Sequence, residues 1–144
     1  MRISGLLRDK GDFVATVAPG ATITELLAGL AEHGVGALVV TEDGEHIIGI
    51  VSERDVVRAL HRQGTSVMDA LVSDVMTADV ATCAPDAEVD SLMAIMTERR
   101  VRHVPVVLDG RLVGIVSIGD VVKHRLHELV DENLALVEYI QTGR

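Results

Sequence analysis

Two segments of the chain carry the same pair of oxygen-bearing side chains at the same spacing. Residues 49–57 have the sequence GIVSERDVV and residues 114–122 have GIVSIGDVV, so Ser52 and Asp55 recur as Ser117 and Asp120. The first turn of a helix favours phosphate, because free N–H groups and the positive end of the helix dipole lie there. A serine hydroxyl adds a donor, and an aspartate one turn later can accept two hydrogen bonds from the cis-diol of a ribose. The spacing is therefore suited to a nucleotide.

The same spacing has a second interpretation that needs no ligand. Ser-x-x-Asp at a helix start is close to a capping box, in which the serine oxygen and the acid each accept a hydrogen bond from a backbone N–H. Either pair taken alone is better explained as a cap, because caps far outnumber ligand sites. The choice depends on whether the carboxylates of Asp55 and Asp120 face a cleft or fold back onto their own helices.

The two pairs lie at the ends of two copies of one sequence unit. A shift of 66 residues aligns residues 14–19 with 80–85, and Asp43-Gly44 with Asp109-Gly110. After one extra residue near His46 the shift becomes 65, which aligns the two GIVS segments. Self-similarity over most of a unit indicates a duplication, and two like units are expected to pair about a pseudo-two-fold axis.

Each copy is expected to fold in the order β-α-β-β-α. A short β-branched run comes first, a helix follows, two apolar strands are joined by Asp-Gly, and a second helix begins at Ser52 or Ser117. Thr22 and Glu25 predict a capping box at the first helix. The fold class is α/β, of the α+β kind, with the two repeats packed together because a unit of about 65 residues is only marginally stable alone.

The predicted domain boundaries follow from the repeat. Residues 1–65 form the first repeat and residues 66–144 the second, which carries a C-terminal helical extension through Leu126 and Val137. Residues 64–77 are expected to connect the copies.

Composition limits the classes of function. Hydrophobic residues make up 48% of the 144 residues and aromatic residues only 1%, so the core must be aliphatic. The net charge of −9 disfavours nucleic acid as a partner, as does the lack of aromatic stacking platforms. The single cysteine, Cys83, excludes an internal disulfide, and no apolar run approaches the roughly 20 residues of a membrane span. With no signal peptide at the N-terminus, a cytoplasmic protein without a membrane partner is expected.

Other chemistry-bearing residues form no established pattern. Of the six histidines, His124 and His127 have a possible metal-ligand spacing, but no Cys or carboxylate joins them in an established pattern. Neither a phosphate-binding loop nor a GxGxxG segment occurs. No general base is paired with Cys83. We therefore predict no catalytic residues, no metal and no obligatory cofactor.

The repeated order of elements, the GIVSxxD segments and the VRHVPVV run at residues 101–107 resemble a tandem pair of cystathionine-beta-synthase-type (CBS) domains. The resemblance covers about residues 3–125 and is to the stand-alone bacterial type, often named a Bateman module. It implies a regulatory, non-enzymatic module that binds an adenosyl compound between the repeats. AMP, ADP and ATP are the first candidates, and S-adenosylmethionine and NAD(H) are further ones. It also implies a homodimer and a regulated partner protein that the sequence does not identify.

The resemblance further implies that each cleft combines the Ser-x-x-Asp end of one copy with strands of the other. The first cleft would then contain Ile50, Ser52, Arg54 and Asp55 together with Thr82, Ala87, Val101, Arg102 and His103. The second would contain Ile115, Ser117 and Asp120 together with Thr16, Ala21, Val35, Gly36 and Ala37. In each, the aspartate would hold ribose, the threonine would contact the adenine edge and the isoleucine would line the base pocket.

The two clefts are expected to differ in affinity. Arg54, Arg102 and His103 give the first cleft a basic complement, whereas Glu53 opposes a phosphate there. The second cleft has Gly119 in the place of Arg54. Three alternatives to the nucleotide module stay open: a structural or partner-binding protein whose Ser-x-x-Asp pairs only cap helices, an enzyme such as a nucleotide hydrolase, and a nucleic-acid-binding protein.

Overall fold

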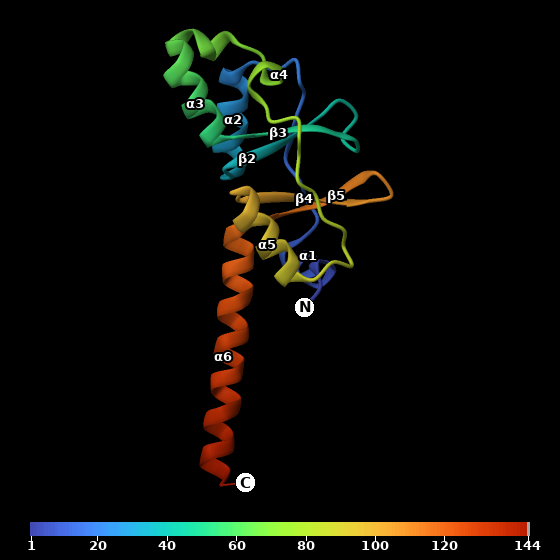
Figure 1. Ribbon diagram of the computed structural model, residues 1–144, viewed down its shortest axis with the longest axis vertical. Helices are drawn as coiled ribbons and strands as arrows, with labels where there is room; N and C mark the ends of the chain where they lie inside the picture. The colour runs from blue at the N-terminus through green and yellow to red at the C-terminus, as the bar shows by residue number, and fades with distance from the viewer. Residues whose placement is uncertain (144) are drawn as a thin grey trace.

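Two aliphatic cores, one in each half of the molecule, organise the fold in the computed structural model, which describes residues 1–143. The first half contains the elements β1 (Thr16–Val17), α2 (Ile23–His33), β2 (Ala37–Thr41), β3 (Ile47–Ser52) and α3 (Glu53–Gln63). The second half contains the elements α5 (Val89–Arg99), β4 (His103–Leu108), β5 (Arg111–Ser117) and α6 (Ile118–Thr142). Figure 1 shows the halves stacked, with their strands facing the junction and their helices outside. The predicted mixed fold of two like units is confirmed.

The sheet of the first half places Ser52 beside the start of the central strand. Its order is β1-β2-β3, with β1 parallel to β2 and β2 antiparallel to β3, and all five residues of β2 are buried. Ala37 pairs with Ser52 at one end of the ladder. Since α3 begins directly after Ser52, the helix N-terminus lies next to the first residue of β2.

The sheet of the second half has two strands, β4 and β5, rather than the three that the repeat predicts. The expected first strand is reduced to a single parallel bridge between Cys83 and Val106. Proline explains the loss. In the first half the N–H of Val39 donates to the carbonyl of Ala15 across 3.4 Å. The repeat places Pro105 at the position of Val39, and proline has no N–H to donate.

Two segments pack against the half that is not next along the chain. The segment before the first repeat packs in the second core, and the segment before the second repeat packs in the first core. Helix α1 (Ile3–Lys10) comes before the first repeat, yet Ile3, Leu6 and Leu7 are buried in the second core. The 3-10 helix η1 (Gly64–Asp69) and the short helix α4 (Val72–Val75) pack in the first core. Residues 64–77 therefore do more than connect the copies, because their apolar side chains complete a core.

This exchange gives the glycine of each GIVS segment a packing role. A Cβ atom at Gly114 would lie 2.8 Å from a methyl carbon of Leu7, and one at Gly49 would lie 3.0 Å from the carbonyl oxygen of Thr77. Any larger residue would push away the segment that each half borrows.

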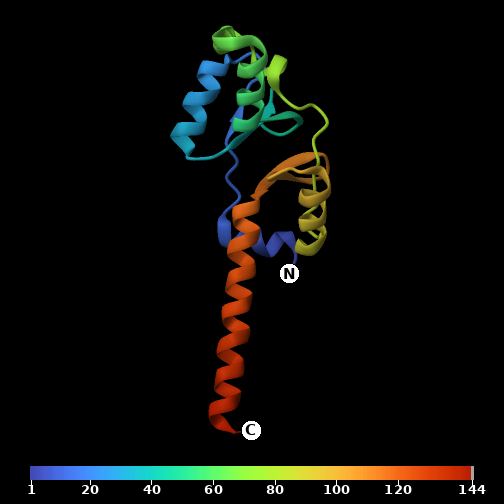
Figure 2. The same ribbon diagram turned by 60° about the vertical axis from the view of Figure 1, so that its left-hand side comes forward.

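The last helix, α6, is 25 residues long and runs out of the second half (Figures 1 and 2), which confirms the predicted helical extension. Val121 in its second turn is buried, whereas the apolar residues beyond it are exposed. Within the described residues, no helix combines the length and the apolar character that crossing a bilayer requires.

Candidate nucleotide site

Both Ser-x-x-Asp pairs form complete capping boxes. The N–H of Asp55 donates to Ser52 Oγ across 3.3 Å, and the N–H of Ser52 donates to Asp55 Oδ2 across 2.9 Å. The matching distances at Ser117 and Asp120 are 3.2 and 2.8 Å. The capping interpretation is thus confirmed at both sites, and each carboxylate folds back toward its own helix.

Capping leaves each carboxylate with capacity for another donor, because an ionised carboxylate has two oxygens and about four lone-pair positions. The Asp55 cap uses Oδ2, and Thr77 Oγ1 lies 3.5 Å from Oδ1. Backbone hydrogen bonds of 2.8 and 2.9 Å between Thr77 and Ile50 fix this threonine beside the site. Asp55 can therefore cap α3 and still accept a hydroxyl donor through Oδ1.

The second carboxylate has a different neighbour. Lys10 Nζ donates to Asp120 Oδ2 across 2.5 Å and to the carbonyl oxygen of Ile115 across 2.7 Å. Burial acts to raise the pKa of Asp120, but hydrogen bonds from Lys10 and Ser117 outweigh it and hold that pKa below its ordinary value. The carboxylate is an anion paired with an ammonium group at neutral pH.

Side chains of the two halves meet beside these helix starts. Arg54 Nη1 lies 3.4 Å from the carbonyl oxygen of Arg100, which joins α3 to the end of α5. His103 packs against Gly36, where a Cβ would lie 3.4 Å from its ring, and the carboxyl carbon of Glu53 is also close to that position. Burial lowers the pKa of His103, and the nearby Lys10 charge acts in the same direction. The imidazole at this junction is neutral at pH 7.

The strand starts also bond to the helix starts, in the same way in both halves. The carbonyl of Gly36 accepts from the N–H of Glu53 across 3.0 Å, and that of Arg102 accepts from the N–H of Ile118 across 2.8 Å. These equivalent bonds leave fewer free donors at the helix N-termini than the sequence interpretation assumed.

The remaining predicted cleft residues lie on strands and turns around the two cores. Ala21, Ala87 and Val101 pack against the cores, Ala37 is buried in β2, Ile50 and Ile115 are half-buried, and Thr16, Thr82, Val35 and Arg102 are exposed. Within residues 1–143, no hydrogen bond joins Asp55 or Asp120 to a predicted partner residue of the opposite copy. Their roles at adenine and ribose stay predictions.

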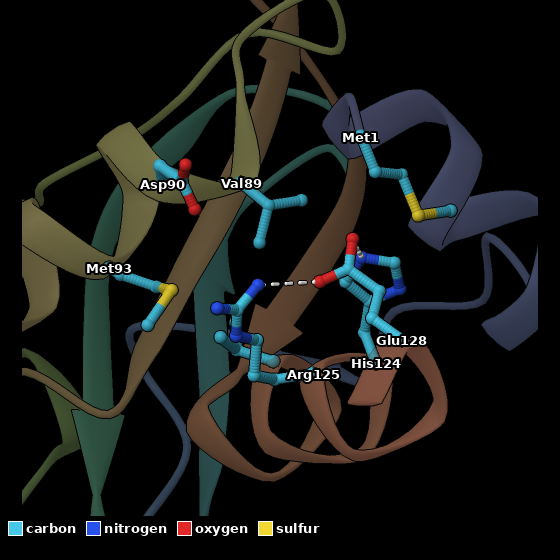
Figure 3. Close-up of a pocket in the computed structure, with 8 residues that line it drawn as sticks. Met1, Val89, Asp90, Met93, His124, Arg125 and Glu128 are labelled. Carbon is cyan, nitrogen blue, oxygen red and sulfur yellow. Dashed lines mark hydrogen bonds and ion pairs between the residues drawn. The ribbon is translucent and has the colours of Figure 1, made fainter. Parts of the chain in front are cut away.

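The structure has a groove beside α2 and the start of α3, and a small cavity beside α5 and α6. The groove measures about 450 Å³ and is lined by Leu27, Leu30, Ala31, Gly34, Val35, Gly36 and Glu53. Two of these residues, Val35 and Gly36, belong to the predicted second cleft. The cavity in Figure 3 lies between α5, α6 and the N-terminus and measures about 70 Å³. That volume is well below the roughly 300 Å³ of a small-molecule pocket, and Arg125 there pairs with Glu128.

Two residues of the site, Lys10 and Thr77, are absent from the predicted set. The signal that could have found them is the repeat itself, since the 66-residue shift places Lys10 on Met76 and Gly11 on Thr77. Both pairs come three to four residues before the aligned runs that begin at residues 14 and 80. Within the described residues, no group of three His, Cys, Asp or Glu side chains could hold a metal ion.

Cys83 is expected to react slowly with thiol reagents. Burial raises the pKa of its thiol to about 11, so the reactive thiolate is scarce at pH 7.5. Timed labelling with a maleimide should be much slower in the native chain than in the chain unfolded in urea, and should accelerate as the pH rises. Equal rates in both states at pH 7.5 would contradict the burial of this thiol.

Comparison with known proteins identifies what the chain resembles. The family description "CBS domain" matches residues 11–62 and 72–127. The mitochondrial CBS domain-containing protein CBSX3 of Arabidopsis thaliana is 40% identical over 126 residues, which are 85% of this chain. The chain spans only 61% of the length of that relative.

Solved structures give the same result for the fold. The CBS-domain containing protein ATU1752 from Agrobacterium tumefaciens is 46% identical, with a TM-score of 0.84 over 87% of this chain and 99% of that one. The CBS domain pair of protein MJ0100 has a TM-score of 0.79 over 89% of this chain and 98% of that one. That pair is 24% identical and was crystallised with 5-methylthioadenosine and S-adenosyl-L-methionine.

Proposed function

Because the chain belongs to the CBS-domain family, as a tandem pair of CBS repeats, we propose that it is a regulatory module that binds an adenosyl compound. The ligand would lie in clefts between the two halves and alter their packing. The proposal assigns no catalytic step to this chain. It also places the protein in the cytoplasm, where the single thiol of Cys83 would stay reduced.

The observation that carries the proposal is the duplicated helix start at Asp55 and Asp120. Each carboxylate lies at the N-terminus of a helix beside the junction of the halves, and each cap uses the Oδ2 oxygen. Such a carboxylate can accept hydrogen bonds from a ribose diol, and a helix N-terminus favours the phosphate that follows it. The adenosyl ligands of the MJ0100 pair support the ligand class. AMP, ADP and ATP are our first candidates, followed by S-adenosylmethionine and NAD(H).

A panel of thermal melts tests this function. AMP, ADP, ATP, S-adenosylmethionine and NADH would each be added at millimolar concentration to the full chain. A ligand present at about 100 times its dissociation constant should stabilise the native state by roughly 2.7 kcal/mol. For a domain of this size that corresponds to a rise in Tm of about 5–10 °C. An unchanged Tm with all five compounds would contradict the proposal.

A second function is favoured by the completeness of both capping boxes. If Ser52, Asp55, Ser117 and Asp120 serve only as caps, the chain is a partner-binding protein that needs no nucleotide. Unchanged melting with all five compounds of the panel would favour this alternative.

The proposal includes a second copy of the chain as partner, paired along α6. Its exposed face carries residues at alternating intervals of four and three, namely Val122, Leu126, Leu129, Asn133, Leu136 and Ile140. The apolar members are each at least 47% exposed. The spacing is that of the a and d positions of a coiled coil, with Asn133 at an a position. A lone asparagine there pairs best with itself across a parallel two-fold axis, so the helix is complementary to its own copy.

Leu129→Glu with Leu136→Glu is therefore expected to convert the dimer to a monomer. The change would bury four charges in one parallel seam, which costs more than the two helices gain by pairing. Sedimentation equilibrium measures the mass directly. Leu134→Glu is the matched control, because Leu134 is an exposed leucine of the same helix that lies outside this face. A wild-type monomer, or equal dissociation by the control, would contradict the pairing.

A further inference from the structure

We propose that Lys10 is an internal competitor for the second cleft, so that an adenosyl ligand fills the Asp55 cleft first and the Asp120 cleft only by displacing the Lys10 ammonium group. This inference rests on the proposed function. It assigns a role in ligand discrimination to a residue outside the two repeated motifs.

The ammonium group of Lys10 already holds the oxygen atoms that a ligand would need. Its Nζ donates to Asp120 Oδ2 across 2.5 Å and to the carbonyl oxygen of Ile115 across 2.7 Å. The side chains of Lys10 and Asp120 are only 30% and 22% exposed, so water screens their attraction less than it screens a surface pair. A ribose hydroxyl must therefore compete with a charge-assisted hydrogen bond.

The position of Lys10 is fixed by the packing of α1. Ile3, Leu6 and Leu7 anchor this helix in the second core, and Lys10 is its last residue. Gly11 follows with φ +100°, a conformation that side chains rarely adopt, and its N–H donates to the carbonyl of Leu7 across 2.7 Å. The helix end and the turn after it direct the lysine to the Asp120 site.

Within residues 1–143, no cationic side chain contacts the carboxylate of Asp55 in the first cleft. The repeat places Met76 at the position of Lys10, and a thioether cannot neutralise a carboxylate. Asp55 has instead the hydroxyl of Thr77, at the long distance of 3.5 Å. The sequence already predicts unequal clefts from Arg54 and Gly119. The structure adds a larger difference, because among the described residues a cation pairs with Asp120 and none pairs with Asp55.

Displacement of Lys10 would also connect the second cleft to the rest of the chain. Lys10 lies directly before the connector that rises from α1 to β1 in the other half (Figure 1). A ligand that releases the ammonium group thereby frees the last turn of α1 from Asp120. Such a ligand shifts the packing only by its differential affinity for the paired and released states.

Calorimetric titration with AMP tests the inference in the full chain. Asp55→Ala removes the first cleft, and Lys10→Met, which installs the residue of the other copy, is then added to it. The added change is expected to lower the Kd for AMP by about tenfold, the strength of one charge-assisted hydrogen bond. Lys10→Gln keeps a hydrogen-bond donor without the charge. Added to Asp55→Ala, it should give a Kd for AMP between that of Asp55→Ala alone and that of Asp55→Ala with Lys10→Met.

Arg8→Met is the matched control. Arg8 lies on the same helix and its replacement removes the same charge, but it makes no ion pair with Asp120 in the described part of the chain. The control should leave the Kd unchanged. An unchanged Kd in Lys10→Met would overturn the inference. A higher Kd would also overturn it, because it would indicate that Lys10 contacts the ligand. If the wild-type chain binds no AMP, the proposed function fails. If the wild-type chain binds AMP but Lys10→Met does not lower the Kd, only the inference about Lys10 fails.

Discussion

Asp55→Ala is expected to remove most of the stabilisation that AMP gives to the chain. The substitution deletes the acceptor of two hydrogen bonds from the ribose, and hydrogen bonds to a charged group contribute about 1.5–3 kcal/mol each. The Kd at that cleft should rise by roughly a hundredfold or more. At a ligand concentration that stabilises the wild-type chain by about 2.7 kcal/mol, the altered cleft would then contribute about 0.4 kcal/mol. Thermal melts with and without AMP measure both values.

The control must separate ligand binding from capping, because Asp55 also caps α3. Its removal costs about 1 kcal/mol of stability even without ligand. Glu25→Ala is the matched change, since Thr22 and Glu25 form the same capping box at α2 and neither belongs to a predicted cleft. That variant should lose a similar basal stability and keep the full response to AMP. A full response in Asp55→Ala, or an equal loss of response in Glu25→Ala, would show that the carboxylate acts only as a cap.

Ile3→Ala is expected to unfold the second half preferentially, although Ile3 precedes the first repeat in the sequence. Its side chain is 0% exposed and lies in the second core. Truncation of a buried isoleucine to alanine costs about 2–5 kcal/mol. Hydrogen exchange should show a loss of protection in β4 and β5 that is larger than any loss in β2 and β3.

Phe13→Ala provides the comparison for that prediction. Phe13 is a larger apolar residue from the same N-terminal segment, but it is 72% exposed, so its truncation should change stability by less than about 0.5 kcal/mol. Equal loss of protection in both halves of the Ile3 variant would contradict the assignment of α1 to the second core. Urea unfolding of the two variants gives the overall free energies.

Much of the fold follows from local patterns in the sequence. Ser52 and Ser117 mark the helix starts because a serine followed by an acid three residues later satisfies two orphan N–H groups. The extra residue near His46 is confirmed, since residues 42–46 form a longer turn stabilised by the Asp43 carboxylate. In the second copy, the two-residue turn Asp109-Gly110 has positive φ at both positions, 52° and 76°.

The sequence does not predict which of the two cores a segment packs in, or the contacts that follow from that packing. The apolar residues of α1 show that one face is buried, but the pattern is the same whichever core receives it. Lys10 and Asp120 are 110 positions apart, so no local signal connects them. Pro105 is an exception that could have been used, because a proline inside a strand indicates a missing ladder bond.

In the candidate site, too, the residues within the repeated motif are predictable from sequence, whereas those contributed by distant segments are not. The repeat identifies Asp55 and Asp120, and the cap geometry there is confirmed. Thr77 and Lys10, which complete their surroundings, come from segments outside the GIVSxxD motifs. Distant segments thus make the two aspartates unequal, although their local sequences place them alike.

A calorimetric titration of the full chain with AMP is the decisive test of nucleotide binding at Asp55 and Asp120, because it counts the occupied clefts. We expect up to two bound AMP molecules per wild-type chain and one in either Asp55→Ala or Asp120→Ala. We expect none in the double variant. Binding of AMP to the double variant with unchanged stoichiometry and Kd would contradict the claim that these two carboxylates hold the ligand.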